Sequence, residues 1–451
     1  MQTLKRGQPL ASVIALVPEG ISFFLAGDAF QARCLSVYAN DEDVAPLFNR
    51  VKEADVAFMN LEIAIHSFEG HPIGEDKYDA YGQADPDVAH DVKQTGFSIV
   101  SRANNHAMDY SEGGLEATSW HLDNVGLIHA GAGMNLAEAR EPAYMETPKG
   151  TVALISATTW RLGLAGHARK DVKGRPGVNP LRMNHVYHMA PEDWLRQKEV
   201  ASSLGLLPED HEKGFNFPVR GQRFVPGDTT YRELVPHPLD LEENLKAVRG
   251  ARQLADWVMF SLHDHYATLK APAGYRDNEV PPKAVEEFAH RVIDAGADMY
   301  VGHGPHILRG IEVYKGKPIF YSLGNWVFQS TLCRRQPSDL FEQWGLTAEH
   351  TTADLYLKRE EPPSKFFSDP AYWESVVAEV DYKDGELSEV RLIPVHLDYD
   401  PGRPLVEQRN KAGVPHLATG ERAEKILRHV AHLSKLYGTE IEVKAGIGYI
   451  K

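Results

Sequence analysis

The sequence contains little cysteine and no long apolar run. Its 451 residues include only Cys34 and Cys333, which cannot build the disulfide framework of a small secreted protein and favour a reducing compartment. No stretch approaches the roughly 18 consecutive apolar residues of a membrane-spanning helix. The apolar segment 10–17 lacks the length and the cleavage site of a secretory signal. The sequence therefore predicts a cytoplasmic protein without a membrane partner.

Positive charge is also scarce. The 48 Lys and Arg residues are outnumbered by 63 Asp and Glu residues, which gives a formal net charge of −15. Proteins that bind nucleic acids carry a basic surface, so we expect no nucleic-acid partner. The length predicts two or three domains, or one large α/β domain with insertions, and either can bury a large core. Nothing in the sequence specifies the oligomeric state.

Apolar strands alternate with amphipathic helices along most of the chain. This rhythm predicts a layered α/β domain with parallel strand pairing. Strands are expected at 21–26, 56–59, 97–100, 125–130, 152–157, 257–262 and 299–301, hairpins at 310–321 and 376–394, and helices at 44–54, 85–95, 111–124, 241–254, 282–295 and 421–437. We divide the chain into an N-terminal extension (1–20), a main domain (21–330) and C-terminal strands and a helix that pack on the same domain (331–451).

Residues 161–245 interrupt the rhythm. They are rich in glycine, proline and basic residues. A long irregular stretch inside a compact domain is usually a lid or a binding element. Arg161, Arg175 and Arg182, together with Arg102, are our candidates for binding an anionic substrate. The alternative is a solvated surface loop.

Five predicted strand ends carry polar side chains with ligand atoms. In open α/β sheets the carboxyl ends of the strands form the ligand crevice. Burying several charged groups there is costly unless a cation is bound, and carboxylate, amide and imidazole ligands suit Mn, Zn, Fe or Co. The sequence therefore predicts one or two divalent metal ions at this edge. The groups are Asp28, Glu62, Asn104-Asn105-His106, His263-Asp264-His265 and His303 with His306.

Several motifs resemble the CapA family, which is named for poly-γ-glutamate capsule synthesis and is itself similar to calcineurin-like metallophosphatases. The resemblance covers about residues 20–330 in order. It implies an α/β fold of the metallophosphatase-like α/β/β/α sandwich type, with an inserted irregular lid and C-terminal additions. The motifs are Gly27-Asp28, residues 54–62, 103–110, 131–140, 294–298, 302–306 and 321–328. The metal ligands that the resemblance implies are Asp28, Glu62, Asn105, His263, His303 and His306.

The sequence departs from the superfamily pattern at three places. Phe30 stands where a histidine usually follows the first aspartate by two positions. His303 and His306 are three residues apart, whereas the usual motif is His-x-His, and the block 261–266 lacks the common Trp-Gly. These departures leave open whether one metal or two is bound and whether phosphoesters are substrates. Capsule-associated members also resemble membrane-anchored proteins, and this sequence shows no anchor.

Three functions fit these features. The first is a metal-dependent hydrolase that cleaves an amide (peptide or γ-glutamyl) or phosphoester bond with metal-bound hydroxide, acting on an anionic small molecule or peptide. The second is a metal-dependent epimerase or lyase, in which His265, oriented by Asp264, moves a proton. The third is a non-catalytic assembly protein for a capsule-type polymer.

Two further catalytic candidates follow the strand at 97–100. Asn104 is positioned to hydrogen-bond a developing oxyanion, with a helix cap as the alternative. His106 is the other, with an ordinary loop histidine as its alternative. For His265 the alternative is a residue that only supports a metal ligand or lies at the surface.

Overall fold

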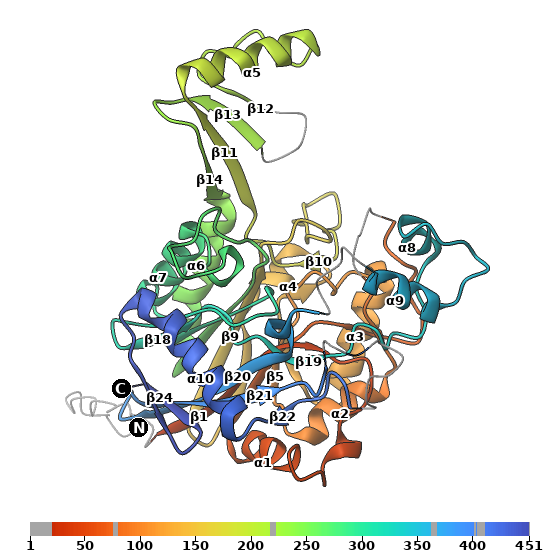
Figure 1. The fold of residues 1–451 in the computed structure, drawn as a ribbon, viewed down its shortest axis with the longest axis vertical. Coiled ribbons are helices and arrows are strands. Elements are labelled where there is room, and N and C mark those ends of the chain that lie inside the picture. Colours follow the sequence, from red (N-terminus) through yellow and green to blue (C-terminus); the bar gives the residue numbers. More distant parts are fainter. Residues whose placement is uncertain are drawn as a thin grey trace, which may run out of the picture.

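The computed structural model describes residues 20–74, 80–216, 222–361, 368–400, 403 and 411–450, so the predicted N-terminal extension, apart from Gly20, lies outside the described residues. Two β-sheets form the centre of the molecule, and helices cover their outer faces (Figure 1). The predicted α/β/β/α sandwich is therefore confirmed.

The first sheet contains ten of the described strands. From one edge to the other they are β23 (Ile441–Lys444), β24 (Ile447–Ile450), β21 (Glu386–His396), β20 (Glu374–Lys383), β1 (Ile21–Phe30), β2 (Val56–Leu61), β5 (Ile99–Ser101) and β6 (Ile128–Ala130), with β19 (Asn325–Phe328) beside β1 and β22 (His416–Leu417) beside β21. Strands β2 and β19 run parallel to β1, whereas β20 runs antiparallel to it. The C-terminal hairpin thus extends the same sheet that begins the domain.

The second sheet has six described strands. They are β17 (Ile311–Tyr314), β18 (Lys317–Phe320), β16 (Met299–His303), β15 (Trp257–His263), β9 (Gly150–Thr158) and β8 (Ala143–Thr147). Its inner face packs on the first sheet, where Phe23 and Leu25 of β1 share a core with Leu154 and Met259. Strands buried on both faces need apolar residues at nearly every position, which is why these segments are continuous apolar runs.

Helices cover the outer faces of both sheets. They are α1 (Ala45–Glu53), α2 (Asp87–Thr95) and α3 (Ser111–Asn124) on the first sheet, and α6 (Pro238–Leu254) and α7 (Lys283–Asp294) on the second. Helix α10 (Gly420–Ser434) buries Ile426, Leu427, Val430 and Leu433, a stripe with the spacing of one helix face, in the core between the sheets. Within the described ranges, no helix is both long and apolar enough to cross a membrane.

The insertion is more ordered than the sequence suggests. From residue 183 the chain forms a small sheet, β12 (Phe215–Asn216), β13 (Gln222–Pro226), β11 (Met183–Met189) and β14 (Tyr231–Pro236), crossed by helix α5 (Pro191–Ser203). This arm stands away from the body of the molecule (Figure 1). The prediction of an irregular stretch is wrong here, because β11 is mostly half-buried without a regular alternation of polar and apolar residues, and the small core of the arm depends on aromatic residues later in the chain, Trp194 and Phe215.

Short elements complete the fold. Residues 331–375, which show no regular pattern in the sequence, include two helices. Besides a few short 3-10 helices, the remaining α-helices and strands of the described residues are α4 (Leu136–Arg140), α8 (Ser338–Gln343), α9 (Thr352–Glu360), β3 (Ala64–Ile65), β4 (Gln83–Ala84), β7 (Ala132–Gly133) and β10 (Gly177–Val178).

Candidate metal centre

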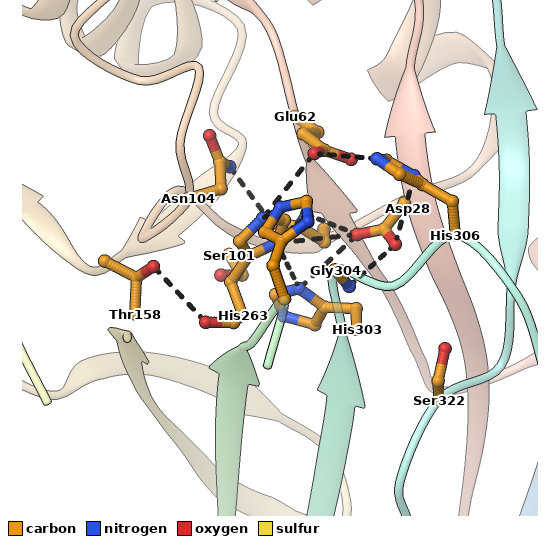
Figure 2. Close-up of polar contacts among 12 residues, drawn as sticks. Asp28, Glu62, Ser101, Asn104, Thr158, His263, His303, Gly304, His306 and Ser322 are labelled. Carbon is orange, nitrogen blue, oxygen red and sulfur yellow. Dashed lines mark hydrogen bonds and ion pairs between the residues drawn. The ribbon is translucent and has the colours of Figure 1, made fainter. Parts of the chain in front are cut away.

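The polar side chains that follow the strands meet at one edge of the sandwich. Asp28 lies near the end of β1, and Glu62 directly follows β2. His263 and His303 are the last residues of β15 and β16 and lie opposite each other in register. Figure 2 shows the side chains of both sheets pointing toward one another. The two sheets thus supply ligand atoms to one buried cluster.

The backbone around Asp28 depends on two glycines. The pairing of β1 with β2 shifts register just before Asp28, and at Gly27 a Cβ atom would lie 1.9 Å from the carbonyl oxygen of Gly324. Only glycine allows this close approach. The N–H of Gly304 donates to Asp28 Oδ2 at 2.8 Å, and Gly304 has a φ of +115°. These contacts fix the carboxylate before any ligand arrives.

The distances within the cluster fit shared cations. Asp28 Oδ1 lies 3.6 Å from His263 Nδ1 and 3.5 Å from His303 Nδ1, and Glu62 Oε1 lies 3.6 Å from both His263 Nε2 and His306 Nε2. Two ligand atoms on one tetrahedral zinc ion are about 3.3 Å apart, given bonds of about 2.0–2.1 Å.

Three groups of ligand atoms emerge among the described residues. They are Asp28 with His263 and His303; Glu62 with His263 and His265; and Asp28 with Glu62 and His306. The donor set of carboxylate oxygens and imidazole nitrogens, almost entirely buried, matches a divalent transition metal.

Hydrogen bonds outside the cluster orient the histidines. The Asn325 amide nitrogen donates to the carbonyl oxygens of His306 and Tyr372, so its oxygen accepts the Nδ1–H of His306, at 2.8 Å. This leaves Nε2, which faces Glu62, as the nitrogen with the lone pair. Nε2 of His303 forms a hydrogen bond with Ser261 Oγ, at 2.6 Å, and Nδ1 of the same ring faces Asp28. Such outer contacts set the tautomer and ring orientation of metal-binding histidines.

Burial and neighbouring groups set the ionisation of the cluster. Burial lowers the pKa of His263 to about 3, and the nearby Asp28 only partly offsets this. Burial alone would raise the pKa of Asp28, but hydrogen bonds with His263 and His303 and the charge of His306 outweigh it and hold the pKa well below its usual value. A neutral imidazole and an ionised carboxylate are the forms that bind metal.

Asn60, which the sequence analysis did not single out, lies at the centre of the cluster. Its amide nitrogen donates to Asp28 Oδ1 at 2.8 Å and approaches His263 Nδ1 at 3.3 Å. The signal in the sequence was its spacing from Glu62, because residues two apart in a strand point to the same side.

Asn104, the predicted oxyanion donor, is held by hydrogen bonds within the site. Its amide nitrogen donates to Asn60 Oδ1 and to the carbonyl of Leu61, and its oxygen accepts the N–H of His106. Both amide hydrogens are therefore used within the fold, and the predicted bond to an oxyanion is not supported.

His106 forms a buried pair with Asp109. Its Nδ1 lies 2.7 Å from Asp109 Oδ2, and that oxygen also accepts the N–H of Gly82. A histidine held by a carboxylate is a common arrangement for proton transfer. Asp109 was missed, although its spacing of three residues from His106 is visible in the sequence.

A cavity of about 120 Å³ borders the cluster. His106 opens onto it together with Asn105, His265 and His306, and Phe30 packs edge-on against the His106 ring. Arg359 of α9 also lines the cavity, so the C-terminal part of the chain contributes to the site.

The predicted partnership of Asp264 and His265 is absent. His265 Nε2 lies 2.9 Å from His263 Nε2. Asp264 instead accepts from Thr159 Oγ1 at 2.7 Å and pairs with Arg309, at 3.4 Å. Adjacent residues in an extended chain point to opposite sides, which separates the two side chains. Asp264 therefore anchors the loop after β15 and does not orient His265.

Three of the four predicted arginines line one cleft of about 1070 Å³. They are Arg161, Arg175 and Arg182. Arg182 forms a two-pronged ion pair with Asp240, at 2.6 and 2.7 Å, so much of its charge is already balanced. Arg102 is buried elsewhere and donates to Ser119 Oγ and to the carbonyl of Leu115, which ties β5 to α3. The structure does not support a substrate-binding role for Arg102.

Comparison with known proteins identifies relatives along nearly the whole chain. The protein y4uA of Sinorhizobium fredii, named as uncharacterized, is 32% identical over 448 residues, covering 96% of this chain and 94% of that protein. The PGA biosynthesis protein CapA of Bacillus subtilis is 25% identical, covering 71% of this chain and 67% of that protein.

A solved structure shows only a weak similarity. A hypothetical protein from Thermus thermophilus aligns with a TM-score of 0.39 and 10% identity, covering 83% of this chain and 98% of that one, which is too weak to support an argument. The family described as bacterial capsule synthesis protein PGA_cap matches residues 22–330, more than half of the sequence. The chain belongs to this family.

Proposed function

We propose that the chain is a divalent-metal-dependent hydrolase. The observation that supports this is the convergence of Asp28, Glu62, His263, His303 and His306 from both sheets into one buried cluster. Without a cation, burying so many charged and polar groups would lower the stability of the fold, because nothing would compensate for their lost hydration. A divalent ion in such a site acts as a Lewis acid and lowers the pKa of a water molecule that it binds.

His106 is our candidate for the proton donor to the leaving group. Its Nδ1 lies 2.7 Å from Asp109 Oδ2, and the ring lines the same cavity as His306. The buried carboxylate keeps the ring in one orientation. This assignment replaces the predicted pairing of His265 with Asp264.

The substrate that we favour is an anionic peptide or polymer with γ-glutamyl bonds; a phosphoester is the alternative. The cleft that carries Arg161 and Arg175 is also lined by Met108 and Ser111, which lie shortly after His106 in the chain. Its volume of about 1070 Å³ is much larger than the roughly 120 Å³ of the cavity at the cluster, so it has more room for a chain-like substrate. The name of the Bacillus subtilis relative, a PGA biosynthesis protein, points to the same class of compound.

The test combines metal analysis with hydrolysis assays. The purified full-length protein is expected to carry a divalent metal and to cleave γ-glutamyl peptides or a phosphoester, and Asp28→Asn and His303→Ala should lose metal and activity together. His188→Ala, on the arm, is the matched control. A metal-free, metal-indifferent wild-type protein would contradict the proposal. Solvent deuterium entering a substrate carbon without hydrolysis would favour the epimerase or lyase instead.

A further inference from the structure

His265 lies within the cluster of ligand atoms itself, at a distance typical of a metal ligand. Its Nε2 is 2.9 Å from Nε2 of His263, and the same nitrogen of His263 is 3.6 Å from Glu62 Oε1. The three ligand atoms all lie within 4.8 Å of one another. The two measured separations bracket the roughly 3.3 Å expected for ligands of one tetrahedral ion.

The surroundings of His265 fit a metal ligand. Its ring packs against Trp160, with the ring centroids 5.5 Å apart, and meets the His306 ring at 5.7 Å. These contacts hold the ring on the cavity side of the cluster, where it is partly exposed. Two imidazole nitrogens 2.9 Å apart are joined either by an N–H proton or by a cation, and the Glu62 carboxylate lies close enough to serve as a third ligand of such a cation.

Two aromatic side chains, Phe30 and Phe328, line the same cavity as His265. Phe30 packs on His106, and Phe328 packs on His306, with ring centroids 4.8 Å and 5.2 Å apart. Neither phenylalanine offers a ligand atom next to Asp28. A further nitrogen donor is supplied instead from the loop after β15, on the side of Glu62.

We infer that His265 is a metal ligand, which binds a divalent ion together with Glu62 and His263. The inference rests on the proposed function, because it takes the cluster to be a metal centre. It changes the role of His265 from proton transfer to coordination. His265 lines the small cavity, so an ion held by these three residues would lie at the side of the cluster that faces the cavity.

Metal binding by the purified full-length protein tests the inference directly. After metal removal, wild type, His265→Ala and the control His188→Ala are titrated with Zn²⁺ and Co²⁺, and bound metal is counted by elemental analysis. We expect His265→Ala to lose one ion per chain or to bind it at least about tenfold more weakly, since even residues that only support a ligand have effects of this size. His188→Ala should match wild type.

A ligand exchange gives a second readout that does not depend on activity. In Co²⁺-loaded His265→Cys, a thiolate at a ligand position produces a new thiolate-to-cobalt charge-transfer absorption. Wild type, which already contains Cys34 and Cys333, and His188→Cys should lack it. Because the cysteine variant keeps a ligand atom, it remains informative if His265→Ala fails to fold.

The outcomes separate this inference from the proposed function. If His265→Ala keeps the wild-type number and affinity of ions, or if His265→Cys binds cobalt without the new absorption, the inference is wrong while the metal centre stands. Unchanged metal binding with lost turnover would return His265 to the acid or base role. If wild type binds no divalent ion, both the inference and the proposed function fail.

Discussion

Replacement of Asn325 by alanine should weaken metal binding without touching a ligand. The Asn325 amide accepts the Nδ1–H of His306 and donates to the carbonyls of His306 and Tyr372. It thus holds both the ring and the backbone of a residue whose φ is +59°, a conformation that costs about 1–3 kcal/mol for a non-glycine residue. The Asn325 side chain therefore stabilises both the ring orientation and the strained backbone of His306.

The size of the effect follows from these contacts. Loss of such a supporting contact typically lowers metal affinity by about 10- to 100-fold. Three hydrogen bonds at about 1 kcal/mol each give a loss of about 3 kcal/mol in the free energy of unfolding of the metal-free protein. Asn325→Asp is the matched variant, because its carboxylate still accepts the Nδ1–H of His306 but cannot donate to the two carbonyls.

Zinc titration and urea unfolding measure the two effects separately. We expect Asn325→Ala to lose both affinity and stability, and Asn325→Asp to lose stability while keeping more of the affinity. Wild-type metal affinity in Asn325→Ala, in a protein that is measurably destabilised, would refute the argument that this amide orients His306 for coordination.

Three other predictions follow from the geometry. Gly27→Ala should unfold or fail to accumulate, because its Cβ would collide with the carbonyl of Gly324, and wild-type thermal stability would contradict this. The metal-free protein should lose stability as the pH falls from about 6.5 toward 3, because the buried imidazole of His263 binds a proton in this range only after the protein unfolds. His263 alone should lower the free energy of unfolding by up to about 1.4 kcal/mol per pH unit. A urea midpoint that is flat over this range would count against that pKa. Arg175→Ala should raise KM for an anionic substrate with kcat unchanged, whereas Arg182→Ala should mainly lower stability; the reverse pattern in steady-state kinetics and thermal unfolding would exchange their roles.

The layered fold was readable from the sequence wherever the physical signal is local. Strands such as β15 are apolar at nearly every position because both of their faces are buried, and α7 places Val285, Phe288, Ala289 and Val292 on one face. The arm was not readable in this way. Strand β11 is only half-buried, and its aromatic partners come from α5 and β12, which follow it in the sequence.

The sequence by itself determined which side chains stand at the ends of the strands, because the change from apolar to polar residues marks each end. It thereby supplied Asp28, Glu62, His263, His303 and His306 as candidates for one metal centre. Only the tertiary structure decided how these groups are supported and which neighbours join them. Arg359 reaches the cavity from a helix about 330 residues after Asp28, and Asn325 approaches His306 from β19. Adjacent polar residues such as Asp264 and His265 face opposite sides of the backbone and so have different partners. The distances across the sandwich depend on how the two sheets pack, and no local sequence pattern encodes that packing.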